Sequence, residues 1–368
     1  YVLRDLRQPG GGTSSAEDAD SEGVEGKFYV WTDTQVREIL GEEADVGRHW
    51  YGFRPGGNFE HGTTIPNRMH ARGELARPPE VEAARRALFD ARTERVRPGL
   101  DDKVLTEWNA YLVSALAEAG AVTGERRWVD AAAETAAFLL DHLRREDGRW
   151  LRAWQAEAGA RHLAYAADHG ALVDAFTRLA EATGEARWIA EARSAADALL
   201  ELFWDVDHGG VFTTGHDAEE LIARPKDLMD NATPGANGLA AVGLLRLAAL
   251  TGDERYRAHG EAIVRLLGAM AVEHPTAFGH VLAAVDLVAR GTTEIVVAGD
   301  RPDLVDVVRS AFRPTAVLAW GERYDGPLWE GRDDGRAYVC QGYTCRLPAS
   351  TVTELTTQLE DGVNRSGT

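Results

Sequence analysis

A short motif that returns three times constrains the fold more than any other feature of this sequence. The copies are Thr123-Gly124-Glu125, Thr183-Gly184-Glu185 and Thr251-Gly252-Asp253, and an aromatic residue follows each at the same offset: Trp128, Trp188 and Tyr256. Helix-like stretches flank each copy, so the motif indicates the tight turn of a helical hairpin. Repeated hairpins predict a solenoid or a closed helical toroid.

The two helices of each hairpin differ in composition. The first is poor in charge and rich in Ala, Leu and Gly, which indicates burial on several sides. The second is amphipathic, with apolar residues at helical spacing and Arg or Glu between them. Apolar positions also align between the repeats, as in Leu116, Phe176 and Leu244. Inner helices followed by outer helices are what a toroid requires, so we expect a fold dominated by α-helices.

The sequence predicts two parts of unequal size. Residues 1–291 are expected to form an (α/α)6 toroid, and residues 292–368 a small β/α appendage docked on it. Within the appendage, the runs Glu294–Ala298 and Ala316–Trp320 are typical of buried strands. The first residues, Tyr1–Arg7, resemble the end of an outer helix, so the toroid is expected to be incomplete at its N-terminus.

Composition narrows the classes of partner. The formal net charge is −19, which argues against nucleic acid or an anionic membrane as a partner. No apolar run approaches the roughly 20 residues that span a bilayer, and a cytoplasmic location is expected. Cys340 and Cys345 lack the further ligands of a structural zinc site, and base rates favour two buried thiols over a disulfide. We expect neither a cofactor nor a metal.

Long segments connect the hairpins at the end opposite the Thr-Gly turns. They comprise residues 10–27, 97–106 and 208–234. Long loops on a rigid scaffold are the usual place for binding and catalytic residues. We therefore expect the functional site at this long-loop end.

Polar residues recur at equivalent positions near the starts of the three predicted inner helices. Asn109, His169 and Asn237 each lie 14 residues before the Thr of their turn, and Asp102 and Asp230 each lie 21 before it. Helix N-termini offer free N–H groups to hydroxyl, carboxylate or phosphate groups. Asn and Asp are also common helix caps, which is the structural alternative.

Two segments could supply acid–base chemistry. Asp168 and His169 are adjacent, and a carboxylate near a histidine can tune its titration. The acidic run 17–22 contributes Asp18 and Asp20, and paired carboxylates hydrolyse glycosides. A buried, hydrogen-bonded histidine and a solvated acidic loop are the alternatives. The predicted catalytic residues are Asp18, Asp20, Asp102, Asp168, His169 and Asp230.

Other polar and aromatic residues of the same loops are candidates for binding a substrate. Lysines can pair with hydroxyl-bearing or anionic ligands, and tryptophans stack on sugar rings. An ion pair between loops and an aromatic core are the alternatives. The predicted substrate-binding residues are Lys103, Trp108, Asn109, Lys226, Asn237 and Trp31.

Six segments together resemble a known family. They are Ser15–Glu22, Glu25–Thr32, Gly57–Glu60, Arg97–Asn109, Lys226-Asp227 with Asp230–Asn237, and Val339–Pro348. In this order they resemble the YyaL / spermatogenesis-associated protein 20 family of thioredoxin-domain-containing proteins. The resemblance implies an (α/α)6 toroid of the six-hairpin glycosidase type, related in shape to sugar epimerases. It also implies that a thioredoxin domain and the first hairpins precede this segment and are absent from it. Where this chain has Asp168-His169-Gly170, family members often carry Asp-Tyr-Ala.

Two functions remain open at this point. The first is a carbohydrate-related protein with glycoside hydrolase-like or sugar epimerase-like activity on a small sugar-like ligand. It predicts a funnel at the long-loop end in which two carboxylates converge. The second is a non-catalytic binding or scaffold domain that supports an N-terminal thioredoxin module. It predicts that the polar loop residues cap helices and pair with one another. A terpenoid-cyclase-like toroid is disfavoured, because the acidic run lies in a Gly-rich loop and not on a helix.

Overall fold

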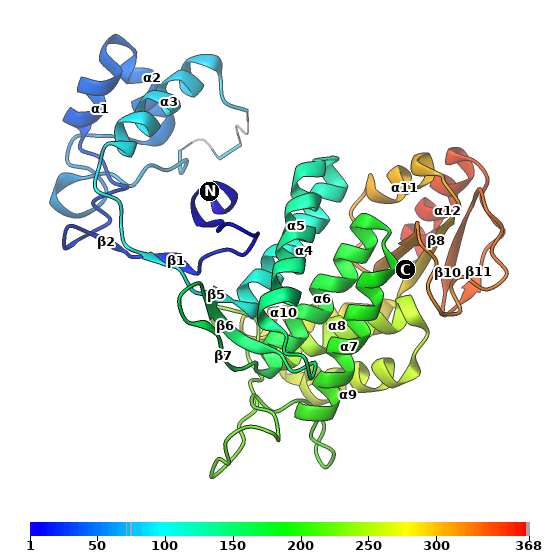
Figure 1. Ribbon diagram of the computed structural model, residues 1–368. Coiled ribbons are helices and arrows are strands. Elements are labelled where there is room, and N and C mark those ends of the chain that lie inside the picture. Colours follow the sequence, from blue (N-terminus) through cyan, green and yellow to red (C-terminus); the bar gives the residue numbers. More distant parts are fainter. Residues whose placement is uncertain (71, 74–75, 366–368) are drawn as a thin grey trace. The chain divides into compact units, whose positions relative to one another are not determined.

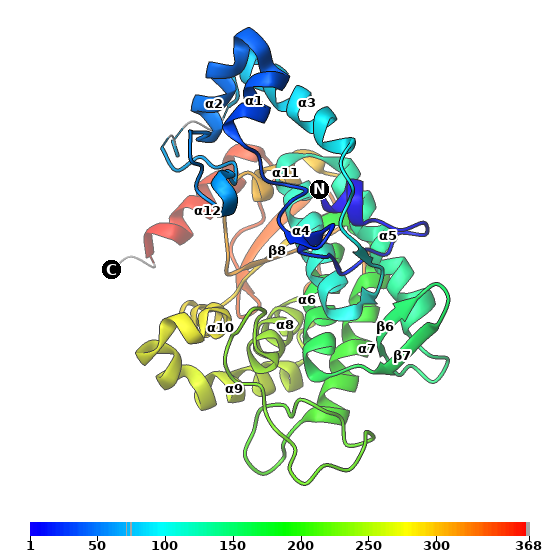
Figure 2. The same ribbon diagram turned by 90° about the vertical axis from the view of Figure 1, so that its left-hand side faces the viewer.

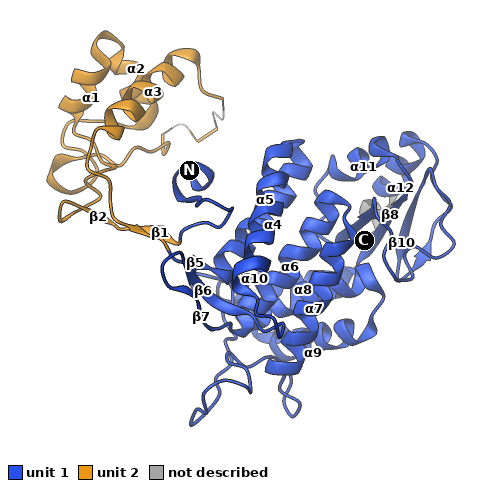
Figure 3. Ribbon diagram, in the orientation of Figure 1, with its two compact units in different colours: residues 1–14, 103–368 blue, residues 15–102 orange. Residues whose placement is uncertain are grey.

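The computed structural model describes residues 1–70, 72–73 and 76–365, and the chain divides into two compact units. Unit 1 comprises residues 1–14 and 103–368, and unit 2 comprises residues 15–102 (Figure 3). The predicted appendage, residues 292–368, therefore lies within unit 1.

Unit 1 is built on helical hairpins. The pairs are α4 (Thr106–Thr123) with α5 (Arg126–Leu143), α6 (Ala166–Thr183) with α7 (Ala186–Phe203), and α8 (Ala236–Thr251) with α9 (Glu254–Glu273). The inner helices α4, α6 and α8 pack in a row, and α10 (Gly279–Arg290) continues it beside α8 (Figures 1 and 2). The predicted α-helical hairpin architecture, with inner and outer helices, is confirmed.

The Thr-Gly motif forms the turn of each hairpin as predicted. Helices α4, α6 and α8 end at its threonine, whose hydroxyl donates to the carbonyl four residues earlier. The glycines that follow have φ of +73°, +72° and +73°: Gly124, Gly184 and Gly252. Glycine adopts this left-handed conformation without the steric cost that a Cβ adds, which explains why it recurs at this position.

Burial differs between inner and outer helices. Every residue of α8 is buried, whereas the outer helices α5, α7 and α9 bury one face. The aromatic residue after the turn anchors the outer helix: Trp188 stacks on Phe176 of α6 at 5.9 Å, and the Tyr256 hydroxyl donates to Asp197 at 2.8 Å. The first contact lies within one hairpin, and the second joins the outer helices α7 and α9 of neighbouring hairpins.

A short β-bridge follows the outer helices α5 and α7, and another follows the N-terminal segment Val2–Leu6. The bridged pairs are Arg7 with Thr13, Arg144 with Trp150 and Trp204 with Val211. The first of these follows a single π-helical turn, Val2–Leu6, where the sequence predicts the end of an outer helix. The N-terminal segment therefore repeats the backbone pattern seen after α5 and α7.

Two small sheets complete unit 1. Strands β5 (Val104–Leu105), β6 (Leu151–Gln155) and β7 (Gly159–Leu163) form an antiparallel sheet that the hairpin pattern did not predict. The second sheet has the order β11-β10-β8-β9 and consists of β8 (Thr293–Ala298), β9 (Ala316–Trp320), β10 (Arg336–Gln341) and β11 (Thr344–Cys345). β8 and β9 are parallel and are joined through α11 (Pro302–Arg309). The last helix of the described residues is α12 (Val352–Arg365). Both predicted strands are confirmed.

Cys340 and Cys345 form a disulfide, so the expectation of two thiols is wrong. The register of β10 and β11 places the two residues directly opposite each other in an antiparallel pair. Residues so placed lie close enough for their sulfur atoms to join. The five-residue separation of the two cysteines did not reveal this register.

Unit 2 is a small helical unit with its own core. It contains α1 (Asp33–Leu40), α2 (Ala44–Tyr51) and α3 (Pro79–Thr93), with short strand pairs β1 (Ala16–Glu17) with β4 (Leu100–Asp101) and β2 (Asp20–Ser21) with β3 (Val24–Glu25). Trp31, Val36, Phe53 and Leu88 form its buried cluster.

Candidate functional site

Asn109 and Asn237 fix the connecting segments to the inner helices. The Oδ1 atom of Asn109 accepts a hydrogen bond from the Thr13 backbone N–H at 2.8 Å, and its Nδ2 donates to the Thr13 carbonyl at 3.1 Å. Asn237 makes the same pair of bonds with the backbone of Val211, at 2.8 and 3.0 Å. Both amides are buried. These two repeat-equivalent residues therefore act on backbone groups.

Asp230 and Lys226 also bind groups of the protein. Asp230 accepts from the backbone N–H of Gly235 at 2.9 Å and from that of His280 at 2.8 Å, which ties the loop to the first turn of α10. The Lys226 ammonium pairs with Asp205 at 2.7 Å. Each contact matches the structural alternative for that residue, a helix cap for the aspartate and a loop ion pair for the lysine.

Asp168 lies at the centre of a buried polar cluster at the long-loop end. Its carboxylate accepts hydrogen bonds from the backbone N–H groups of Glu107 at 3.0 Å and Tyr165 at 2.7 Å, and from Arg152 Nη1 at 2.8 Å. Burial raises the pKa of Asp168 to about 6, although the Arg152 guanidinium opposes that rise. A carboxyl group in this range can exchange a proton near neutral pH.

Glu107 brings a second carboxylate to the same cluster. Its Oε2 atom lies 3.4 Å from Arg152 Nη1, the atom that also binds Asp168, and its Oε1 accepts from the Tyr111 hydroxyl at 2.9 Å. One guanidinium thus joins two carboxylates. Burial raises the pKa of Tyr111, and the Glu107 charge adds to the effect. The sequence did not predict Glu107, Tyr111 or Arg152 as site residues.

His169 turns away from this cluster. Its Nδ1 lies 2.9 Å from the Tyr165 carbonyl, the ring lies 4.9 Å from that of Phe203, and Nε2 has no hydrogen-bond partner among the described residues. Burial lowers its pKa to about 4. The imidazole is therefore neutral at neutral pH and holds the first turn of α6.

The remaining predicted residues fall in both units. Trp108 is 42% exposed beside Glu107, and Lys103 is half-buried in unit 1. Asp18, Asp20 and Asp102 are exposed in unit 2, where Asp18 accepts from the Asp20 backbone N–H at 3.1 Å. Trp31 is buried in unit 2 with the Arg95 guanidinium 3.7 Å from its ring centre, so it is a core residue there.

A row of polar side chains continues along the inner helices from the loop end toward the turn end. We call it the inner-helix polar stripe. Its spacings of three and four residues place its members on one face of each helix. Its members are Glu107, Tyr111, Ser114 and Glu118 on α4, Asp174, Arg178 and Glu181 on α6, and Arg246 on α8.

Asp174 links two inner helices in the middle of the stripe. It accepts from the Ser114 hydroxyl at 2.9 Å and from Arg178 Nε at 2.9 Å, and Arg178 also pairs with Glu118 at 2.6 Å. Burial by itself raises the pKa of Asp174, but the Arg178 and Arg246 charges outweigh it and lower the pKa. Asp174 is therefore ionised at neutral pH.

Arg246 is the only charged residue in the sequence of α8 and is buried. Its Nη2 pairs with Glu181 at 2.5 Å, and its Nε lies 3.8 Å from Asp174. His280, at the start of α10, is close enough to Asp174 and Asp230 for both carboxylates to oppose the lowering of its pKa that burial causes. The stripe thus spans α4, α6 and α8, and His280 of α10 lies near its Asp174 carboxylate.

The described part of the chain gives two further findings. It contains no group of three or more His, Cys, Asp or Glu side chains placed to hold a metal ion. Among its helices, none combines the length and the apolar character needed to cross a membrane.

Comparisons with known proteins bear on the family. Human spermatogenesis-associated protein 20 is 29% identical to this chain over 414 residues, which cover 96% of this chain and 53% of the human protein. The chain is a homologue of spermatogenesis-associated protein 20. This confirms the resemblance seen in the six sequence segments. The chain spans about half the length of the curated relatives it matches, and no protein-family model matches it.

Solved structures with similar helical arrangements are distant in sequence. The cellobiose 2-epimerase of Bacillus thermoamylovorans is 14% identical with a TM-score of 0.40, covering 71% of this chain and 66% of the epimerase. A family 76 glycoside hydrolase (mannosidase) of Bacteroides thetaiotaomicron is 15% identical with a TM-score of 0.38, covering 46% of this chain and 45% of the hydrolase.

Proposed function

We propose that the loop-end half of the inner-helix polar stripe binds a small ligand rich in hydroxyl groups, of the sugar type. The observation that carries this proposal is the set of polar side chains that two inner helices direct to one place. Tyr111, Ser114 and Asp174 are each partly exposed, so a ligand can reach them. A phenol, a hydroxyl and an ionised carboxylate can donate to and accept from the hydroxyl groups of one sugar.

Acid–base chemistry of the glycoside hydrolase or epimerase type is the more specific form of this proposal. Glu107 and Asp168 share Arg152, and the pKa of Asp168 is raised to about 6. Paired carboxylates are the usual acid and base of glycoside hydrolases. Both carboxylates are buried, so the Tyr111 hydroxyl, bonded to Glu107, is the group of this cluster that meets the ligand.

A saccharide panel tests the proposal. Monosaccharides and disaccharides are screened by thermal unfolding, and a ligand at one hundred times its Kd stabilises the folded protein by about 2.7 kcal/mol. We expect one class of sugar to raise Tm, and Ser114→Ala to reduce the shift. Asp130→Asn, on the exposed face of α5 and far from the stripe in sequence, is the matched control. A panel in which no sugar changes Tm would contradict the proposal.

A second candidate is a non-catalytic scaffold role. It is favoured by the contacts of Asn109, Asn237 and Asp230, which bind backbone groups of the protein. It predicts that substitutions at these residues lower the free energy of unfolding and that no sugar is bound. The same panel separates the two candidates, since saturable sugar binding is expected only for the first.

A further inference from the structure

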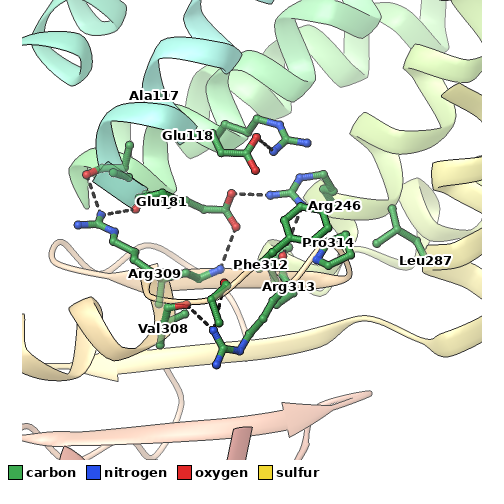
Figure 4. Close-up of a pocket in the computed structure, with 18 of the residues that line it drawn as sticks. Ala117, Glu118, Glu181, Arg246, Leu287, Val308, Arg309, Phe312, Arg313 and Pro314 are labelled. Carbon is green, nitrogen blue, oxygen red and sulfur yellow. Dashed lines mark hydrogen bonds and ion pairs between the residues drawn. The ribbon is translucent and has the colours of Figure 1, made fainter. Parts of the chain in front are cut away.

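A cavity of about 360 Å³ lies at the turn end of the inner helices, away from the site proposed above. Its walls are the C-terminal halves of α4, α6 and α8, one face of α10, and the segment 308–318 that joins α11 to β9 (Figure 4). Its volume is within the range of roughly 300–1,000 Å³ found for small-molecule sites. All of its lining residues belong to unit 1.

Two arginines of this cavity donate their hydrogen bonds to backbone carbonyl groups, and Arg309 also lies over the Trp320 ring, 4.9 Å from its centre. Arg309 donates to the carbonyls of Glu181 and Ala182, both at 2.9 Å, and Arg313 donates to those of Val308 and Ala311, at 2.8 and 3.2 Å. Among the described residues, no carboxylate forms an ion pair with either guanidinium. Burial lowers the pKa of both arginines, and the nearby carboxylates, Asp306 and Glu181 for Arg309 and Glu360 for Arg313, only partly oppose this effect.

The acidic residues of the lining are already paired with other arginines. Glu118 pairs with Arg178, and Glu181 with Arg246. Asp286 pairs with Arg290 on its own helix at 2.6 Å. The lining therefore holds four arginines against three acidic residues, a small excess of positive charge, although the chain as a whole carries a net charge of −19. A partly desolvated guanidinium in such surroundings is stabilised by an anion.

A further donor at this cavity lacks an acceptor. Arg246 lines the wall, its side chain is 5% exposed, and its Nε, which lies 3.8 Å from Asp174, makes no hydrogen bond within the part of the chain that the structure describes. Buried polar atoms are normally hydrogen-bonded, so one that makes no hydrogen bond beside a cavity can take a further acceptor. This observation is independent of the excess charge.

The rest of the lining is apolar. Phe312 is 85% exposed beside Arg313. Small and branched side chains of the helices face it across the cavity: Ala117, Ala121, Val122, Val242 and Leu287. An exposed aromatic ring near unpaired arginines fits a ligand that has a charged group and an apolar body.

We propose that this turn-end pocket binds a small amphipathic anion, with a carboxylate or phosphate group on Arg309 and Arg313 and an apolar body against Phe312. Carboxylate and phosphate share the geometry that guanidinium groups recognise. This second site is separate from the sugar-type site proposed at the loop end of the stripe.

Calorimetric titration with simple probes tests the proposal. Octanoate and octyl phosphate represent the two anionic groups, inorganic phosphate lacks the apolar body, and octyl glucoside lacks the charge. We expect one octyl anion to bind at least tenfold more tightly than inorganic phosphate, and octyl glucoside not to bind in this pocket. Arg313→Gln should weaken binding at least tenfold, whereas Arg313→Lys retains part of it. Arg265→Gln, at a 67% exposed side chain on α9, is the control.

The outcomes separate this proposal from the sugar site. Equal affinity of Arg313→Gln and the unchanged protein for the octyl anions would overturn it, as would binding of octyl glucoside that Arg313→Gln weakens as much as it weakens binding of the anions. Binding of inorganic phosphate with no gain from the octyl chain would also overturn it. Ser114→Ala leaves anion binding unchanged and weakens only the binding of a sugar, so the two proposals fail independently.

Discussion

At the scale of single residues, the repeat correctly predicted which residues occupy equivalent positions, but it did not predict what their side chains bind. Asn109, His169 and Asn237 do occupy equivalent places, and each binds backbone groups near the start of its inner helix. Two of them reach the residue of a β-bridge that follows an outer helix. These equivalent residues were predicted to bind a ligand. Their side chains instead attach the connecting segments to the inner helices.

His169 gives a pH-dependence that can be measured. Its pKa falls from 6.5 to about 4 on folding, so the unfolded chain takes up a proton in this interval that the folded protein does not. The stability it contributes is full above pH 6.5 and is lost as the pH falls to 4, by about 3 kcal/mol. His169→Asn keeps a neutral donor, as at Asn109, and should lack this loss.

The test is urea unfolding of both proteins between pH 7 and 4. Asp168, whose pKa is raised on folding, contributes with the opposite sign: its stabilisation is present at low pH and is lost as the pH rises through about 6. Because Asp168 is present in both proteins, the difference between them isolates His169 to a first approximation. Parallel curves of unfolding free energy against pH would show that His169 is not the group concerned.

At the scale of elements, the Thr-Gly turns have different surroundings although their conformations agree. A Cβ on Gly124 would meet nothing within 4 Å, one on Gly184 would lie 3.1 Å from the Trp320 ring, and one on Gly252 would lie 2.4 Å from Pro327 Cγ. The second and third turns are therefore the places where the C-terminal segment packs on the hairpins. The Glu322 backbone N–H donates to the Gly184 carbonyl at 2.7 Å, in agreement with this.

Alanine at the three glycines should separate backbone strain from this packing. Gly124→Ala is expected to lower the free energy of unfolding by about 1 kcal/mol, the cost of a Cβ in the left-handed region. Gly252→Ala should cost at least about 2 kcal/mol more, because Pro327 must move. Gly184→Ala should fall between them. Chemical unfolding of the three variants measures this order, and equal costs would refute the packing argument.

The sequence predicted the elements well where a periodic pattern determines them. The hairpins, their glycine turns and the strands β8 and β9 follow from local patterns, so they were predictable. Sheet β5-β6-β7 was not, because its short strands carry no alternating pattern. The Cys340–Cys345 disulfide depends on the register of β10 with β11, which the spacing does not encode.

The site was harder to predict than the fold for a related reason. Asp174, Arg178 and Arg246 are charged residues in helices otherwise rich in Ala, Leu and Gly, and that contrast was a signal in the sequence. Arg152 had none, since it reaches Glu107 and Asp168 from a strand that only the folded chain brings near. The stripe was not predicted, because the candidate residues were taken from the loops and the helix starts and not from these few charges within the inner helices.

At the scale of the whole unit 1, the inner helices carry polar groups at both ends. The loop end holds Glu107, Asp168 and Tyr111, and the turn end opens to the cavity beside Arg309 and Arg313. Glu181 connects the turn end to the C-terminal sheet, because it binds both Arg246 and the Leu318 backbone N–H. Hairpins and sheet therefore form one structure around these groups.

Calorimetric titration measures directly whether the loop-end half of the stripe binds a sugar-type ligand. The saccharide that most raises Tm is titrated into the unchanged protein, Ser114→Ala, Asp174→Asn and the control Asp130→Asn. We expect the Kd to rise at least tenfold for Asp174→Asn, which is a loss of about 1.4 kcal/mol or more of binding free energy. We expect a smaller rise for Ser114→Ala and none for the control. Equal Kd values for all four proteins would contradict the proposal.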